Sequence, residues 1–288
     1  MMQMFTSTSV VRWNGGEPRT ETDELVAEEP LEIRVGGRAM SVTMRTPGLD
    51  IELAAGFLLS EGVVRRREDI LRIRSCPRVK SGNSVEVTLH PDVPIDFEKL
   101  TRHVFAASSC GLCGKATIDA IRAQLDPLDD ADVPHVSAEV IAAMPDVMRR
   151  TQKTFDRTGG LHAAALFDES GRLLVVHEDV GRHNAVDKVL GHALLNDLLP
   201  LNRHVLVVSG RSSFEIMQKA LAGRIPIVAA VSAPSSLAVE FARANGQTLI
   251  GFLRGKRMNV YSGHARVEYG KSVELPAMGN GLIEREVS

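Results

Sequence analysis

The pattern of apolar and polar residues predicts both strands and a helix in the first part of the chain. Two alternating runs within residues 29–46 flank Gly36-Gly37, which is the signal of a two-residue β-hairpin. Residues 50–60 carry apolar side chains at helical spacing, and Gly62 follows as a helix-ending residue. Residues 84–89 alternate again, so we expect a further strand there.

The middle of the chain predicts two short helices around a loop. Residues 96–105 and 116–125 have helical spacing, and the loop at 106–114 separates them. An acidic, proline-bounded connection at 126–134 follows and is the best candidate for a domain boundary. We therefore expect an N-terminal α+β part over residues 25–135.

Apolar strands alternate with helices after this connection. We expect Ser137 to cap a helix that begins at Ala138, and Pro145 to start a further helix that runs to about Arg157. Apolar runs on both sides of residues 168–171 predict another hairpin. The remaining pattern predicts strands at 205–208, 225–231, 248–253 and 258–261, and helices at 181–195, 213–221 and 235–244. Such alternation favours parallel strands that are covered on both faces.

The ends of the chain show weaker patterns. Residues 1–24 read as a flexible polar lead-in without the charged start and apolar run of an export signal. Residues 136–262 form the predicted α/β domain, and residues 263–288 form a tail without clear periodicity. No apolar run approaches the roughly 20 residues that span a bilayer. We therefore expect a cytoplasmic protein that makes no membrane contact.

Composition narrows the possible functions. The 288 residues carry a net charge of −2 and 4% aromatic residues, which argues against a general nucleic-acid binder and against an aromatic platform for single strands. Only three cysteines are present, namely Cys76, Cys110 and Cys113. So small and odd a number does not make a disulfide framework, and any role of these thiols is therefore chemical.

Cys110 and Cys113 are the most informative pair. Two thiols three positions apart can share a metal, exchange a disulfide, or act as a nucleophile and its neighbour. Lys115 and the start of a helix would lower the pKa of a thiol here, and the surrounding glycines leave the sulfur accessible. Zinc would need about two more ligands, and the candidates His162, His177 and His183 do not have finger-like spacing. We interpret Cys76 as an incidental thiol.

With this segment placed, the sequence resembles the formate dehydrogenase accessory sulfurtransferases of the FdhD/NarQ family from about residue 28 to residue 261. The stretches that carry the resemblance are EPLEI at 29–33, AAGFLLSEG at 54–62, SCGLCG at 109–114, GGLHAAA at 159–165, EDVGRHNAVDK at 178–188, SGRSSFE at 209–215 and VSAPSSLAVE at 231–240.

The resemblance implies a sulfur carrier, which is a sulfurtransferase. Such a protein takes persulfide sulfur from a cysteine desulfurase and passes it to the bis-molybdopterin guanine dinucleotide form of the molybdenum (or tungsten) cofactor, before formate dehydrogenase receives that cofactor. The cofactor is bound as cargo, and no permanent metal is expected. The resemblance also implies a cytidine-deaminase-like three-layer αβα core with a smaller N-terminal α+β part, and a homodimer.

The resemblance assigns roles to particular residues. Cys110 maps to the cysteine that carries the persulfide, and Cys113 maps to a second thiol to which the resemblance assigns no definite role. By its chemistry, attack of Cys113 on the Cys110 persulfide would release sulfide and leave a disulfide. The cofactor-binding stretch maps to Phe252, Leu253, Arg254, Gly255, Lys256 and Arg257. On the residues alone, a solvated basic turn explains Arg254, Lys256 and Arg257 equally well.

A second group of residues is placed by the predicted topology. Loops that follow parallel strands meet at one edge of a sheet, where Arg forks and helix N-termini hold phosphates. This reasoning adds Ser209, Arg211, His162, Arg182 and His183 as candidate cofactor contacts. Glu178 and Asp179 precede a helix, where carboxylates can cap, and we interpret Asp179 as structural.

Two other functions compete with sulfur transfer. A zinc nucleoside deaminase needs a His-x-Glu, but Ala163 and Ala164 follow His162, and the cysteine pair precedes the histidine in the chain. A non-catalytic chaperone of the molybdenum cofactor would need the basic loops but not the thiols.

Overall fold

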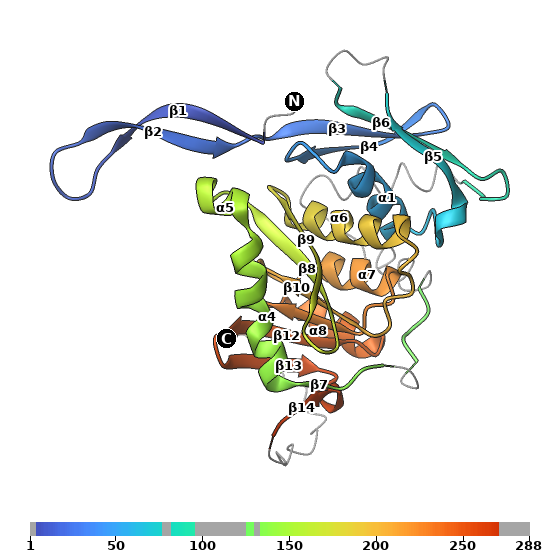
Figure 1. The fold of residues 1–288 in the computed structure, drawn as a ribbon. Helices are drawn as coiled ribbons and strands as arrows, with labels where there is room; N and C mark the ends of the chain where they lie inside the picture. The colour runs from blue at the N-terminus through green and yellow to red at the C-terminus, as the bar shows by residue number, and fades with distance from the viewer. Residues whose placement is uncertain (1–3, 77–81, 96–124, 130–132, 271–288) are drawn as a thin grey trace, which may run out of the picture.

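The computed structural model describes four stretches of the chain, residues 4–76, 82–95, 125–129 and 133–270. Within them the fold is a mixed α/β architecture, as the sequence predicts (Figure 1). The expected helices at 96–105 and 116–125, apart from Leu125, lie outside the described residues, and so does the loop that carries Cys110 and Cys113. No described helix is both long and apolar enough to cross a membrane.

A four-stranded sheet and one helix form the N-terminal part. The sheet has the order β4-β3-β6-β5, with β3 and β6 parallel. The predicted hairpin at Gly36 and Gly37 is confirmed, since both residues have the positive φ that such a turn requires (56° and 82°). The elements are β3 (Glu29–Val35), β4 (Arg38–Arg45), α1 (Asp50–Ser60), the 3-10 helix η1 (Arg67–Asp69), β5 (Ile70–Ser75) and β6 (Ser84–Leu89).

A six-stranded sheet of order β13-β12-β11-β10-β8-β9 forms the centre of the second part. Its strands are β8 (His162–Asp168), β9 (Leu173–Asp179), β10 (His204–Val208), β11 (Ile227–Ala230), β12 (Thr248–Arg254) and β13 (Arg257–Ser262). The predicted parallel pairing holds for β10, β11 and β12. The hairpin predicted around residues 168–171 is also confirmed, because β8 and β9 are antiparallel. Parallel pairing does not extend to the whole sheet, since β8 is antiparallel to β10 and β13 is antiparallel to β12.

Helices cover both faces of this sheet (Figure 1). Ala163, Ala165 and Phe167 of β8 pack in one cluster with α4, whereas Ala164 and Leu166 belong to the cluster that contains α6, α7 and α8. The strict alternation along β8 therefore produces three layers, helix on sheet on helix. The covering helices are α4 (Ala138–Thr151), α6 (Arg182–Leu195), α7 (Phe214–Ala222) and α8 (Ser236–Ala244).

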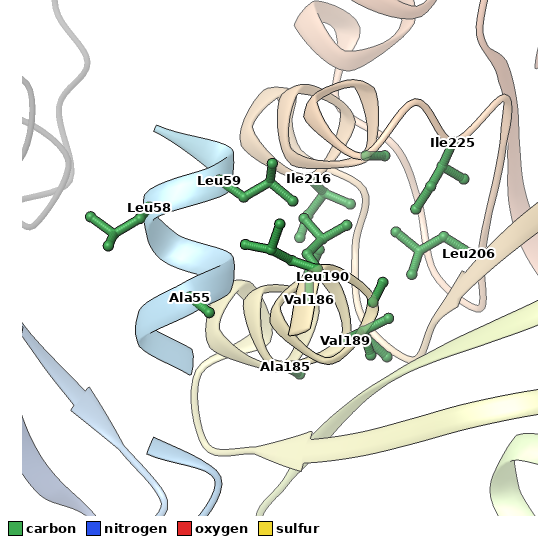
Figure 2. Close-up of a cluster of buried hydrophobic side chains, with 14 of the residues drawn as sticks. Ala55, Leu58, Leu59, Ala185, Val186, Val189, Leu190, Leu206, Ile216 and Ile225 are labelled. Carbon is green, nitrogen blue, oxygen red and sulfur yellow. The ribbon is translucent and has the colours of Figure 1, made fainter. Parts of the chain in front are cut away.

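The two parts share one core, because α1 packs directly on α6. Figure 2 shows Ala55 and Leu59 on the side of α1 that faces α6 and α7, whereas Leu58 points to the opposite side. The two helices meet at Gly56 and Gly191, where a Cβ atom would lie 1.8 Å from a backbone oxygen of the other helix. Only glycine permits so close a crossing, so the two helices of this α1–α6 junction are in direct backbone contact.

The structure corrects the expected role of Pro145. Ser137 caps α4 as predicted, with its Oγ accepting a hydrogen bond from the Val140 N–H at 3.4 Å. Pro145 does not begin a new helix but lies buried within α4. Burial of its ring offsets the hydrogen bond that its missing N–H forfeits. The break comes later, at Gln152, and the short helix α5 (Lys153–Thr158) follows.

The structure also corrects the polar lead-in. β1 (Phe5–Arg12) and β2 (Arg19–Val26) form an antiparallel ribbon that extends away from the body of the molecule (Figure 1). Arg157 of α5 holds its base, because the guanidinium donates to Glu24 (Nε to Oε2, 2.7 Å) and lies over the Phe5 ring. These strands consist largely of polar residues such as Thr and Ser, so apolar residues do not recur at every second position. The hydrophobic pattern of the sequence therefore did not predict strands here.

The beginning of the predicted tail is also ordered. Residues 264–266 form the 3-10 helix η3, and β14 (Val267–Glu268) pairs in parallel with β7 (Val136–Ser137). Val267 is buried in the cluster that contains α4. The start of this segment is therefore held against the second part, and residues 271–288 lie outside the described residues.

Candidate functional site

The candidate site lies at one edge of the six-stranded sheet, where the parallel strands end. β10, β11 and β12 run in the same direction, so the loops at 209–213, 231–235 and 255–256 follow at the same edge. β8 runs opposite to β10, which brings its first residue, His162, to this edge. Helices α6, α7 and α8 begin here, and ligands commonly bind at such an edge in α/β folds.

Backbone hydrogen bonds join the three loops. The Ser235 N–H donates to the Ser212 carbonyl, and the Phe252 N–H donates to the Ser232 carbonyl, both at 3.0 Å. The Arg254 side chain donates from Nε to the Val231 carbonyl at 3.1 Å. The adjacency of these loops, which the order of the strands predicts, is therefore confirmed.

His162 lies against the backbone of the β10–α7 loop. A Cβ atom at Gly210 would lie 3.3 Å from His162 Nδ1 and 3.7 Å from Arg182 Cδ, so the glycine allows both side chains to approach. Ser209 fixes this contact, because its Oγ accepts from the Ala163 N–H at 2.9 Å. Burial lowers the pKa of His162, and the charges of Arg182 and His183 lower it further. At neutral pH the ring is therefore uncharged and can accept a hydrogen bond.

Arg182 and His183 occupy the first turn of α6. His183 Nε2 lies 2.8 Å from Glu215 Oε2 and 3.2 Å from Ser213 Oγ, so α7 holds its imidazole. The hydrogen bond with His183 is the main reason that the pKa of Glu215 is lowered. Arg182 Nε is buried and has no hydrogen-bond partner among the described residues. This free donor fits an anion at the edge.

The predicted basic stretch forms the hairpin between β12 and β13. Arg254, Lys256 and Arg257 are exposed, and Gly255 takes the left-handed conformation of the turn (φ 55°). Leu253 differs from its neighbours, because its side chain is fully buried against the α4 layer. Of this stretch, the exposed side chains of Phe252, Lys256 and Arg257 are accessible to a ligand, and Arg254 is exposed while its Nε holds the Val231 carbonyl. Arg211, in the neighbouring loop, is also exposed.

The two carboxylates that precede α6 have structural roles. Asp179 is fully buried and accepts from the Gly181 N–H at 2.8 Å and from Lys188 Nζ at 2.6 Å. Glu178 accepts from two backbone N–H groups at the start of α5, at 3.0 and 3.2 Å. The structural role of Asp179 agrees with the sequence prediction. Glu178 binds the start of α5 and not of α6, the helix that follows it in the chain.

The structure adds residues that the sequence did not single out. Glu215 positions His183, and Ser212 is fully buried at the edge with an Oγ that has no partner in the described part of the chain. Both lie in the SGRSSFE stretch at residues 209–215. Its position between a predicted strand and a predicted helix is the feature of the sequence that could have indicated them. Cys110 and Cys113, the two predicted catalytic thiols, lie outside the described residues.

No group of three or more His, Cys, Asp or Glu side chains in the described ranges could hold a metal ion. Cys76 lies at the end of β5, half-buried, with its N–H donating to the Ser84 carbonyl at 2.7 Å.

Comparison with known proteins identifies the family. The model of the FdhD/NarQ family matches residues 26–268. A sulfur carrier protein FdhD of Streptomyces coelicolor is 54% identical over 264 residues, which cover 90% of this chain and 94% of the relative. The sulfur carrier protein FdhD of Mycobacterium tuberculosis is 52% identical over 256 residues, covering 86% and 93%.

A solved structure is also similar. A crystal structure described as that of a formate dehydrogenase accessory protein, from Desulfotalea psychrophila, has a TM-score of 0.74 at 26% identity. The likeness covers 92% of this chain and 100% of that one. The family match extends over most of the sequence and includes every loop of the candidate edge. The chain therefore belongs to the FdhD/NarQ family.

Proposed function

We propose that this protein is a sulfur carrier that accepts persulfide sulfur from a cysteine desulfurase on Cys110. It then transfers the sulfur to the bis-molybdopterin guanine dinucleotide cofactor, which is subsequently inserted into formate dehydrogenase. The observation that carries this proposal is the match to the FdhD/NarQ family over residues 26–268, together with close relatives that are named sulfur carriers. The solved relative is described as a formate dehydrogenase accessory protein, which supports the destination of the sulfur.

Loading of Cys110 is a thiol–persulfide exchange. The Cys110 thiolate attacks the outer sulfur of the persulfide on the desulfurase, a new S–S bond forms on Cys110, and the desulfurase cysteine leaves as a thiolate. The step transfers one sulfur atom and needs no external oxidant. Lys115, five residues along the chain, adds a positive charge that favours the attacking thiolate.

The edge of the six-stranded sheet is the proposed binding site of the cofactor, which is substrate rather than a resident group. Its phosphates are matched by Arg182, Arg211, Lys256 and Arg257 and by the helix N-termini. Ser209, His162, His183 and Arg254 complete this proposed surface. The three layers of residues 136–262 support a cytidine-deaminase-like classification, and we retain the homodimer, the cytoplasmic location and the domain limits as parts of the proposal.

Intact-mass measurement tests the carrier residue. The protein is incubated with a cysteine desulfurase and cysteine, and we expect the mass to rise by one sulfur atom. The Cys110→Ala variant should gain none, whereas Cys76→Ala, a matched single-thiol control, should gain as much as the wild type. An adduct that persists in Cys110→Ala would contradict the assignment.

Formate dehydrogenase activity in cells that lack the native carrier separates a sulfur carrier from a chaperone that only holds the cofactor. Cys110→Ala should abolish the activity, and full activity would support the chaperone. For Cys113, we propose that the loop keeps the second thiol away from the loaded sulfur. Sulfide loss from loaded wild type and Cys113→Ala should then be equal, and much longer retention in the variant would refute this protection.

A further inference from the structure

The ribbon of β1 and β2 extends well beyond the surface that supports it. Its two strands form a sheet of their own that projects from the body of the molecule (Figure 1). The body contacts the ribbon at its base, through Arg157 and through Gly160, where a Cβ atom would lie 3.1 Å from Val26 Cγ1. A two-stranded ribbon alone is marginally stable in water, because it needs a further strand or a helix to cover one of its faces.

The two faces of this ribbon differ in their chemistry. Directly opposite residues of an antiparallel pair point to the same face, and the faces alternate along each strand. One face, which we call the outer face, carries ion pairs of Arg12 with Glu21 at 3.1 Å and with Asp23 at 3.6 Å. The opposite, inner face is uncharged beyond the base, and its exposed residues are Ser7, Ser9, Val11, Thr20 and Thr22.

The inner face is also the side that packs on the body at the base. Phe5, Glu24 and Val26 belong to this face by register. The Phe5 ring lies under the Arg157 guanidinium, and Glu24 accepts from Arg157 Nε at 2.7 Å. The same face then continues outward to Val11, whose side chain is 71% exposed. Its lack of charge matches the depletion of charged residues at the centre of protein interfaces.

The size of the ribbon favours a second copy of this chain as its partner. A standard interface takes roughly 20–30 residues from each side, and the inner face of one ribbon supplies far fewer. In a two-fold pair each copy both provides a ribbon and receives one, so the contact is doubled. A different protein would meet the ribbon only once.

The position of the ribbon in the chain also favours this partner. Almost all of it precedes residues 26–268, which match the family model. A surface for a partner that all members share, such as a sulfur donor, is expected within the matched residues. Recognition of a second copy has no such requirement, because the same chain supplies both surfaces.

We propose that the ribbon is an arm that clasps a second copy of the chain, with the inner face against that copy. The inference deepens the homodimer retained in the proposed function, because it names the surface that holds the two chains together. In a two-fold pair the arms are exchanged, and Val11 of each arm is buried against the other chain. The second copy also provides the cover that a lone ribbon lacks.

Two neighbouring valines test the clasp, because Val11 points to the inner face and Val10 to the outer face. Sedimentation equilibrium of the full-length wild type over a range of concentrations should show a dimer. Val11→Lys buries an unpaired charge in the contact and should raise the dimer dissociation constant about tenfold or more. Val10→Lys is the matched control, since it places the same charge opposite Glu21 and should change the constant less than about twofold.

Photocrosslinking gives a second measurement that still decides if Val11→Lys disturbs the ribbon itself. Benzoylphenylalanine in place of Thr20, on the inner face, should give a covalent dimer when the protein is illuminated. The same group in place of Glu21, on the outer face, should give little.

Three results would overturn the inference: equal dissociation constants of Val11→Lys and wild type, an equal rise in both valine variants, or equal cross-linking from the two faces. A wild type that stays a monomer at every concentration would overturn the homodimer as well. None of these measurements depends on the sulfur adduct at Cys110, so failure here is distinct from failure of the proposed sulfur transfer.

Discussion

The α1–α6 junction and the ligand edge of the sheet are built in opposite ways. At the junction, Gly56 and Gly191 allow backbone to meet backbone, and the buried Asp187 carboxylate is paired with Lys219 Nζ at 2.8 Å. Ser60 accepts a further hydrogen bond from the same ammonium at 2.9 Å. The charged groups that face each other here are therefore satisfied within the protein.

At the ligand edge, buried side-chain polar atoms lack partners within the described residues, and one backbone position is strained. Arg182 Nε and Ser212 Oγ have no partner among the described residues, and Phe252 has a left-handed backbone. Both regions share α6, whose first turn lies at the edge while Asp187 and Gly191 lie at the junction. The difference indicates that the junction provides stability, and that this stability supports a strained and incompletely paired edge.

Replacement at the glycine crossing should have the largest effect. Gly191→Ala places a Cβ atom 1.8 Å from the Glu52 carbonyl oxygen, so the helices must separate. We expect a loss of about 3 kcal/mol or more in the free energy of unfolding, measured by urea denaturation with circular dichroism. Gly16→Ala, on the ribbon where no atom lies within 4 Å, should change it by less than about 0.5 kcal/mol. Equal stability of both variants would disprove the close crossing.

The buried ion pair of the junction gives the next largest effect. Asp187→Leu leaves Lys219 buried without its main partner, and we expect a loss of about 3–5 kcal/mol. The double variant Asp187→Leu with Lys219→Met removes both charges and should recover much of that loss. Denaturation of both variants and of the single Lys219→Met gives the coupling energy. Strictly additive losses would show that the two charges do not interact.

His177 tests whether unpaired buried groups are confined to the ligand edge, because its ring lies outside that edge and has a nitrogen without a hydrogen-bond partner in the described residues. Its Nε2 is buried without a partner in the described residues, and burial, followed by the charges of His192 and Lys188, lowers its pKa to about 4. The unfolded chain, with a pKa near 6.5, binds the proton more readily. Stability should therefore fall as the pH drops from about 6.5 to 4, by on the order of 2 kcal/mol. His177→Phe should flatten the profile over this range, and an unchanged slope would contradict the assignment.

The smallest effect on stability is expected at the basic hairpin. Lys256→Ala with Arg257→Ala removes two exposed charges, so unfolding should change by less than about 0.5 kcal/mol. Affinity for pyrophosphate, measured by calorimetry, should fall several-fold and become less sensitive to salt. The double variant Arg72→Ala with Arg74→Ala on β5 removes equal charge from another exposed surface and should bind as the wild type does. Equal loss in both would indicate a non-specific charge effect.

The sequence predicted the elements whose apolar side chains are periodic. The strands and helices from β8 to β13, the cap of Ser137 and the structural role of Asp179 depend on local pattern, so they could be inferred without coordinates. Adjacency of the three loops followed from strand direction alone. The loops that meet at the edge of a sheet can thus be predicted from sequence where the strands are continuous apolar runs.

Prediction failed where long-range contacts override local signals. Pro145 remains within α4 because its ring is buried, which no local rule on proline conveys. The ribbon at residues 5–26 has no apolar stripe, and its pairing depends on cross-strand hydrogen bonds and on Arg157 far along the chain. The bulge at Phe252 and the pairing of His183 with Glu215 depend on neighbouring elements, so spacing could not reveal them.

The ribbon has a practical consequence for spectroscopy. It carries Trp13, the single tryptophan of the chain, whose side chain is 69% exposed. Tryptophan emission in the folded protein therefore already comes from a water-exposed indole, and it will change little when the core unfolds. A shift of that emission to shorter wavelength would instead report that another molecule has covered the tip of the ribbon. The protein thus contains an intrinsic fluorescent probe of contacts made far from its core.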